Sequence, residues 1–259
     1  MDLGLKGKHA LVLSSSQGLG RGVAESLAAE GANVVLTARS ADKLAAAVKA
    51  INAKGFGRAY AVTGDLTRDV DAIYKAASDI ANIDILVANT GGPPARMAVN
   101  AKPEEWAVHF EAMVVPVFRM AGLVLPGMRE RGFGRIITIS STSIVQPIPN
   151  LVISTALRSS IAGWSKTLAV EVANEGITVN MVLPGRIHTD RTAELDIANS
   201  KLQGKTVEQI TQAMLASIPA NRYGRVEEFA DVVCFLASQR ASFVTGSMIR
   251  VDGGAVKGL

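Results

Sequence analysis

The stretch "SSSQGLG", residues 14–20, follows an apolar run near the start of the chain and carries residues suited to binding phosphate. Gly18 and Gly20 would open a helix there, and glycine lets the backbone approach a bound pyrophosphate closely. The N-terminus of a helix also favours negative charge. A glycine pair between a strand and a helix therefore predicts a dinucleotide-binding loop.

Ala38-Arg39-Ser40 follow the second strand-like run, where proteins that bind NAD usually carry a carboxylate for the ribose hydroxyls. Ala38 supplies no carboxylate, whereas the Arg39 guanidinium would attract a 2′-phosphate. We therefore expect NADP(H) rather than NAD(H) as the cofactor. The alternative is that Arg39 is a solvated surface residue.

Apolar runs typical of buried strands alternate with segments of helical spacing along the chain. The expected strands cover 8–14, 33–39, 57–65, 83–92, 134–141, 176–185 and 246–254. The expected helices cover about 19–32, 41–55, 68–81, 103–130 and 152–174. This alternation predicts an α/β fold, a Rossmann-type doubly wound parallel sheet of about seven strands.

Ligands of such sheets bind beyond the carboxyl ends of the strands, which here selects the loops after 13, 38, 64, 88, 141 and 183. Because no linker or repeat interrupts the pattern, we expect a single dinucleotide-binding domain over 1–259. The polar stretch 188–218 stands between the sixth strand and the next helix, and we interpret it as a substrate-binding lid. The alternative is a surface loop with helical pieces.

Composition and charge argue against several classes of partner. The net charge is +4, but Lys and Arg are scattered, so we expect no nucleic-acid partner. No uninterrupted apolar run reaches the roughly 18 residues of a membrane span, and no signal peptide precedes the first strand. We therefore expect a cytoplasmic protein with no membrane partner and no bound metal. Cys234 is the single cysteine, which rules out an internal disulfide, and we expect it to be buried.

Taken in order, these motifs resemble the short-chain dehydrogenase/reductase family, and most closely its 3-oxoacyl-carrier-protein reductase branch. "SSSQGLG" is similar to the family's T-G-x-x-x-G-x-G loop, with Ser14 at the first glycine. "VANTGG", residues 87–92, is similar to N-N-A-G, and "ITVNMVLPGRIHTD", residues 177–190, to I-T-V-N-x-V-x-P-G-x-x-x-T. The resemblance covers nearly the whole chain.

The resemblance implies an oxidoreductase with a small-molecule carbonyl or alcohol substrate, and a homo-oligomer, either a tetramer built through two long helices or a dimer. It also implies a set of cofactor-binding positions. These are Ser14, Ser16, Gln17, Gly18, Leu19, Gly20, Arg39, Ser40, Asp65, Leu66, Asn89, Gly91, Arg158, Pro184, Gly185, Ile187 and Thr189.

The family's chemistry uses a serine, a tyrosine that carries the proton, a lysine four residues later and an asparagine on the preceding helix. The resemblance places Ser141 at the catalytic serine, and counting thirteen residues onward reaches Ser154 at the tyrosine position. Counting back from "GWSKTLAVEV", residues 163–172, reaches the same residue. Arg158 then stands at the lysine position and Met113 at the asparagine position, so we take Ser141, Ser154 and Arg158 as the catalytic candidates.

These replacements change the available chemistry. A serine hydroxyl is a far weaker acid than tyrosine, whose pKa is about 10. Arg158 lies on the same helix face as Ser154 and stays cationic, so it could stabilise an oxyanion but could not act as an acid at neutral pH. Tyr223 and His188 are weaker candidates for a replacement proton donor. We interpret His109, on the long helix, as structural.

Three functions remain open at this point. The first is an NADP-dependent carbonyl reductase, on a 3-oxoacyl thioester-like ketone for example, or an alcohol dehydrogenase, with an altered site. The second is a binding or regulatory protein that holds NADP without turnover. The third is non-redox chemistry like that of halohydrin dehalogenases, which carry arginine at the position of Arg158 but have lost the dinucleotide site that this chain keeps.

Overall fold

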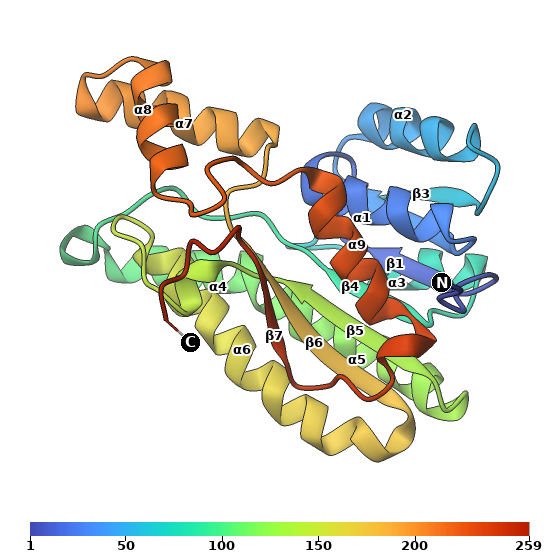
Figure 1. The fold of residues 1–259 in the computed structure, drawn as a ribbon. Helices are drawn as coiled ribbons and strands as arrows, with labels where there is room; N and C mark the ends of the chain where they lie inside the picture. The colour runs from blue at the N-terminus through green and yellow to red at the C-terminus, as the bar shows by residue number, and fades with distance from the viewer. Residues whose placement is uncertain (259) are drawn as a thin grey trace.

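The computed structural model describes residues 1–258, so Leu259, the last residue of the predicted domain, lies outside the described residues. Seven parallel strands form one sheet in the order β3-β2-β1-β4-β5-β6-β7 (Figure 1). The strands are β1 (His9–Val12), β2 (Asn33–Ala38), β3 (Ala59–Thr63), β4 (Ile85–Ala88), β5 (Gly134–Ile139), β6 (Ile177–Pro184) and β7 (Met248–Val251). The predicted fold class is confirmed, and the strand order reverses between β1 and β4, where such sheets bind their ligands.

Helices cover both faces of the sheet. They are α1 (Gly18–Ala29), α2 (Ala41–Asn52), α3 (Val70–Ile80), α4 (Pro103–Met113), α5 (Val115–Glu130), α6 (Val152–Val172), α7 (Asp190–Gln203), α8 (Val207–Ala216) and α9 (Val226–Ala237). One hydrophobic cluster joins the sheet to α3, α5 and α6, and the other joins it to α1, α2 and α9.

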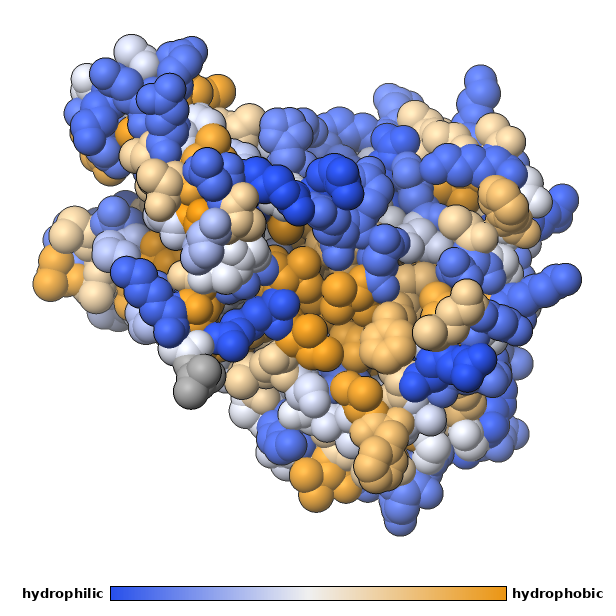
Figure 2. All heavy atoms as spheres, in the orientation of Figure 1, coloured by the Kyte–Doolittle hydropathy of each residue, from blue (hydrophilic) through white to orange (hydrophobic). Residues whose placement is uncertain are grey.

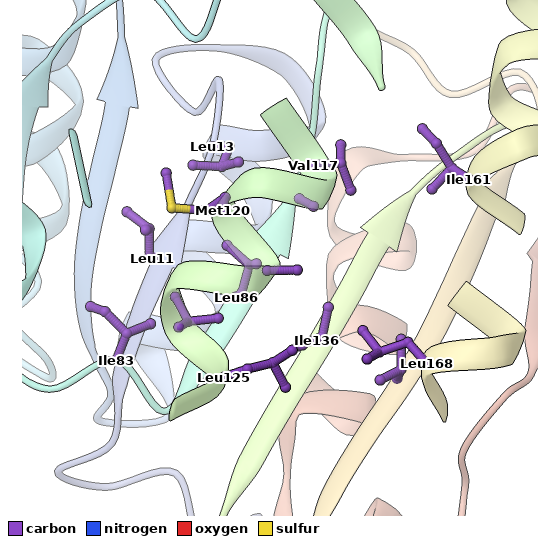
Figure 3. Packing of buried hydrophobic residues seen from close by; sticks show 14 of the residues in the cluster. Leu11, Leu13, Ile83, Leu86, Val117, Met120, Leu125, Ile136, Ile161 and Leu168 are labelled. Carbon is purple, nitrogen blue, oxygen red and sulfur yellow. The ribbon is translucent and has the colours of Figure 1, made fainter. Parts of the chain in front are cut away.

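Successive strand residues point to opposite faces of the sheet, so each strand contributes to both clusters. Leu11 belongs to the first cluster, whereas Ala10 and Val12 belong to the second. All six residues of β5 are buried, as expected for a parallel strand covered on both faces. Figure 3 shows Met120 of α5 packed above the strands that carry Leu11 and Leu86. This double-sided core holds the carboxyl ends of the strands in fixed positions.

The helical region expected over 103–130 is two helices that meet at Val114. Pro116 lacks a backbone N–H and restricts the residue before it, so it fits only the first turn of a new helix. By length and composition alone, 103–130 is long and apolar enough to cross a membrane, as buried core helices also are. However, Val117, Met120 and Val124 of α5 pack into the first cluster, as in a core helix.

The stretch 188–218, predicted to be a lid, contains two helices, α7 and α8, which stand apart from the sheet at the upper left of Figure 1. They follow β6 at its carboxyl end, the edge where the ligand loops gather. That this segment covers a substrate stays a prediction.

Cys234 of α9 is buried in the second cluster, as expected. Burial raises the pKa of its thiol to about 12, so the thiolate is scarce at neutral pH. This cysteine is therefore structural.

Exposed apolar side chains gather along the edge of the sheet formed by β7. The exposed residues are Met248 of β7, Val170 of α6, Phe235 of α9 and Phe243 in the loop before β7. Figure 2 shows apolar residues across the centre of this face. Such patches are typical of protein–protein contact surfaces and are compatible with the expected homo-oligomer, which stays a prediction.

Replacing Met120 with alanine should test the core between α5 and the sheet. Met120 is fully buried, so we expect the free energy of unfolding to fall by about 2–5 kcal/mol in denaturant titrations. Val108→Ala, at a position 65% exposed on α4, should stay within about 0.5 kcal/mol of the wild type. Equal effects of the two changes would contradict this packing.

Candidate functional site

The loops that follow β1, β2, β3 and β4 line a single groove of about 570 Å³ at the carboxyl edge of the sheet. Part of the predicted cofactor-binding set lies together in it. These residues are Ser14, Ser16, Gln17, Arg39, Ser40, Asp65, Leu66 and Gly91. The groove therefore brings the glycine loop, the residues after the second strand and residues 64–66 after the third strand to one place.

A hydrogen bond and the close packing around Gly20 shape the loop after β1. The Asn89 side-chain amide donates to the Ser14 carbonyl oxygen at 3.2 Å. A Cβ added at Gly20 would lie 2.6 Å from that oxygen and 3.0 Å from Asn89 Nδ2, so only glycine fits there. Gly18, in contrast, has a positive φ of 59° and nothing within 4 Å of an added Cβ. The loop thus leaves open space beside the N-terminus of α1, as binding a phosphate requires.

Ser14 adopts a φ of 49°, the left-handed region that favours glycine. Its backbone N–H donates to Thr37 Oγ1 at 3.3 Å, and the Asn89 amide holds its carbonyl. Contacts on both sides therefore keep a non-glycine residue in a strained conformation.

Two cations stand at the end of the groove next to α2. Arg39 is exposed at its mouth, and Lys43, in the first turn of α2, also lines it. Lys43 Nζ donates to Gln17 Oε1 at 2.8 Å, which links α2 to the phosphate loop. Lys43 was not predicted from the sequence, although its place four residues after Arg39, at the start of a helix, was a usable signal.

Asp65 follows β3 and lines the same groove as these cations. The backbone N–H and the hydroxyl of Thr67 both donate to Asp65 Oδ1, at 3.0 and 2.9 Å. These bonds lower the pKa of the Asp65 carboxyl, with smaller help from Arg68 and Arg39. Asp65 is therefore an anion and a hydrogen-bond acceptor at neutral pH.

His109 lines the same groove, a position that was not predicted from the sequence. It lies one turn before Met113 on α4, and both face the loop that carries Gly91 and Gly92. Met113 is buried and presents only a thioether, while its carbonyl accepts from the Thr90 hydroxyl at 3.4 Å. The sequence could not show which face of α4 meets the groove, because α4 is only weakly amphipathic.

Arg158 is buried, with 8% of its surface exposed, and it bonds three separate segments. Its Nε–H donates to Ser154 Oγ at 3.3 Å, one turn earlier on α6. Its Nη1 donates to the carbonyl of Ile139 at the end of β5 at 3.1 Å, and its Nη2 to the carbonyl of Gly91 at 3.5 Å. The predicted proximity of Ser154 and Arg158 is confirmed.

All three acceptors of Arg158 are neutral, and no carboxylate of residues 1–258 forms an ion pair with it. Burial lowers the pKa of its guanidinium to about 10, so it keeps its positive charge at neutral pH. The structure therefore holds an uncompensated cation beneath the loop after β4, where it favours a ligand with negative charge or a negatively charged transition state.

Ser141 follows β5 and begins a short helical turn, η2 (Thr142–Ile144). Its Oγ accepts from the backbone N–H of Ser143 at 3.1 Å. Because that bond uses a lone pair, the hydroxyl proton of Ser141 stays available as a donor.

The structure does not support Tyr223 or His188, the weaker candidates for a proton donor. The Tyr223 hydroxyl donates to Asp196 Oδ2 at 2.8 Å, and burial followed by the bond and charge of Asp196 raises the pKa of Tyr223. That makes it a poorer acid. His188 is exposed, and its described hydrogen bond is a backbone one, to Gly224.

The remaining predicted cofactor residues lie outside the groove lining. Gly18 and Thr189 border a second hollow between α1 and α9, and Thr189 caps α7 by accepting from the Thr192 N–H at 3.3 Å. Leu19 packs against the second hydrophobic cluster. Pro184, Gly185 and Ile187 lie at or just beyond the carboxyl end of β6.

Replacing Ser14 with glycine should relieve the strained backbone. The left-handed conformation costs a non-glycine residue roughly 1–2 kcal/mol, partly offset by the greater freedom of glycine when unfolded. We expect the free energy of unfolding to rise by up to about 1 kcal/mol. Ser16→Gly, on the same loop but without a positive φ, should lower it; a loss of stability in both variants would contradict the strain.

Removing a groove cation should weaken NADPH binding selectively. We expect Arg39→Ala and Lys43→Ala each to raise the NADPH dissociation constant about tenfold in fluorescence titrations, because each loses a charge-assisted contact to a 2′-phosphate. NADH binding should be unchanged. Lys49→Ala, in the exposed last turn of α2, is the matched control. Equal weakening of NADPH and NADH binding would show that the cations do not recognise the 2′-phosphate.

Comparisons with known proteins agree with this geometry. Residues 13–256 match the family described as enoyl-(acyl carrier protein) reductase. The 3-oxoacyl-[acyl-carrier-protein] reductase of Escherichia coli K12 is 36% identical over 252 residues, which cover 97% of this chain and 98% of that protein.

Among solved structures, L-sorbose reductase from Gluconobacter frateurii, complexed with NADPH and L-sorbose, is 35% identical with a TM-score of 0.94, and all of both chains is covered. An NADPH-dependent reductase involved in bacilysin biosynthesis is 27% identical with a TM-score of 0.93, covering 98% of this chain and 100% of the other. With its sheet order, nucleotide groove and these full-length matches, the chain belongs to the short-chain dehydrogenase/reductase family, whose members are NAD(P)-dependent oxidoreductases.

Proposed function

We propose that this protein is an NADP(H)-dependent carbonyl reductase or alcohol dehydrogenase in which Arg158, rather than a tyrosine, interacts with the reacting oxygen. The observation that carries the proposal is the buried Arg158 guanidinium, 3.3 Å from Ser154 Oγ and bonded to the end of β5 and to the loop after β4. In this proposal, Ser154 and Arg158 occupy the positions of the family's tyrosine and lysine.

The residues of the groove fit a phosphorylated dinucleotide. Arg39 and Lys43 would hold its 2′-phosphate, Asp65 its adenine, and the open space at Gly18 its pyrophosphate. When bound, NADPH supplies the hydride. The relatives solved with NADPH support the choice of NADP over NAD.

Arg158 would stabilise the negative charge that develops on the substrate oxygen. A guanidinium has five N–H donors, and three of the groups on Arg158 already hold it in place. Two N–H donors therefore remain for ligands, and their orientation is fixed before the substrate arrives. Ser141, whose hydroxyl proton is available, would donate a second bond to the same oxygen.

The proton itself would come from water. Ser154 and Arg158 are both too weakly acidic to release a proton at neutral pH. A well-placed general acid contributes about 10²–10⁴-fold to such a reaction. We therefore expect hydride transfer that is real but slow compared with tyrosine-containing relatives.

A panel of carbonyl compounds tests this function. We would follow NADPH oxidation with a 3-oxoacyl thioester and a ketose, chosen from the named relatives, and NADP⁺ reduction with the corresponding alcohols. Turnover that Arg158→Gln abolishes supports the proposal. NADPH binding with no turnover across the panel would instead favour a second function, a nucleotide-binding protein, which the engagement of Arg158 with backbone carbonyls also supports.

The double change Ser154→Tyr with Arg158→Lys should raise turnover. Tyrosine would supply the acid that the site lacks, so we expect kcat/KM for carbonyl reduction to increase at least about tenfold. Ser154→Phe with Arg158→Lys has nearly the same shape without the hydroxyl, and should not gain. Equal rates in the two double variants would show that no tyrosine acid operates at this position.

A further inference from the structure

The helix α7 has one buried residue, and that residue is an aspartate. Asp196 is 3% exposed, while the apolar residues Ile197 and Leu202 of the same helix are exposed. Helices of globular proteins usually dock through an apolar stripe, and most of their stability comes from packing that stripe. In α7 the pattern is reversed, because a charged residue is buried and apolar residues are exposed.

The lid, defined as 188–218, is also separate from the two hydrophobic clusters. No residue of α7 or α8 belongs to either cluster within the described part of the chain. The main packing partner of α7 is α8, which has Ile210 as its buried residue. Figure 2 shows a largely hydrophilic surface over these helices. The hydrophobic effect therefore contributes little to the position of α7.

Asp196 bonds two residues of the protein body. Its Oδ1 lies 2.5 Å from Nη1 of Arg186, in the loop after β6, and its Oδ2 accepts from the Tyr223 hydroxyl at 2.8 Å. Backbone bonds join the segments that carry these partners. The Gly224 N–H donates to the Arg186 carbonyl at 2.9 Å, and the His188 N–H to the Gly224 carbonyl at 2.8 Å.

We propose that Asp196 is a positioning residue, and that the polar latch formed by Asp196, Arg186 and Tyr223 fixes α7 above the carboxyl end of β6. The latch shapes the substrate side of the site without touching the nucleotide groove. It does not depend on the redox chemistry proposed above, because it concerns where α7 lies.

The latch also indicates the role of Arg186. Its guanidinium is neutralised by Asp196, so Arg186 holds the lid instead of binding an acidic group of the substrate. If the carboxylate is removed, a partly buried cation and a phenol lose their partner at once, which favours release of α7 into water. Since no residue of α7 belongs to either hydrophobic cluster, its release should leave both clusters intact.

Limited trypsin digestion of the intact protein tests the latch, since the lid offers cleavage sites at Arg191, Lys201 and Lys205. We expect Asp196→Ala to be cut within the lid about tenfold faster than the wild type, because cleavage follows the population of the open form. Asp196→Asn, which keeps an acceptor for Tyr223 but loses the charge, should be intermediate. Ile197→Ala, at an exposed position of the same helix that pairs with none of the cleavage sites, is the matched control and should match the wild type.

Hydrogen exchange and NADPH binding separate a latch from a general fold defect. In Asp196→Ala, amide exchange should rise in 188–218 and stay unchanged in the strands, and the NADPH dissociation constant should remain within about twofold. If turnover is detectable, KM for the carbonyl substrate should rise more than kcat falls. Lid cleavage at the wild-type rate, or faster exchange throughout β1–β6, would overturn the proposal. Neither result depends on whether the protein is a reductase.

Discussion

The ligand edge of this molecule is organised around one buried cation. Arg158 ties α6 to the end of β5 and to the loop after β4, using neutral acceptors alone. Burying a charge without a counter-ion is unfavourable, and its cost is visible in the lowered pKa of the guanidinium. The double-sided core makes this arrangement possible, because it holds the strand ends rigid. The positive charge of Arg158 then stays uncompensated until a ligand binds.

The nucleotide half of the site depends on different forces. There, Gly20, Asn89 and Ser14 fit together so closely that backbone geometry, rather than charge, sets the shape of the phosphate loop. Arg39 and Lys43 add charge only at the mouth of the groove. The two halves can therefore change separately, because backbone geometry shapes the phosphate loop whereas a buried charge organises the region around Arg158.

Local signals made most of the fold predictable. Continuous apolar runs such as β5 and the strand–helix alternation specify a covered parallel sheet, and every predicted strand appears within a few residues of its expected limits. The Ser154–Arg158 contact followed from helical spacing alone. His109 and Asp196 were not predictable in the same way, because their roles depend on which side of a weakly amphipathic helix meets the body. That is set by long-range packing.

The attachment of α7 has a consequence for how such a protein can diversify. A segment that polar contacts of Asp196 and Thr192 join to the body, and that contributes no residue to the hydrophobic clusters, behaves as a module. Insertions, deletions or wholesale exchange between Thr189 and Ile218 would leave the sheet and the nucleotide groove folded. If the lid covers the substrate, as predicted, substrate selectivity could evolve, or be engineered, at almost no cost to the stability of the scaffold.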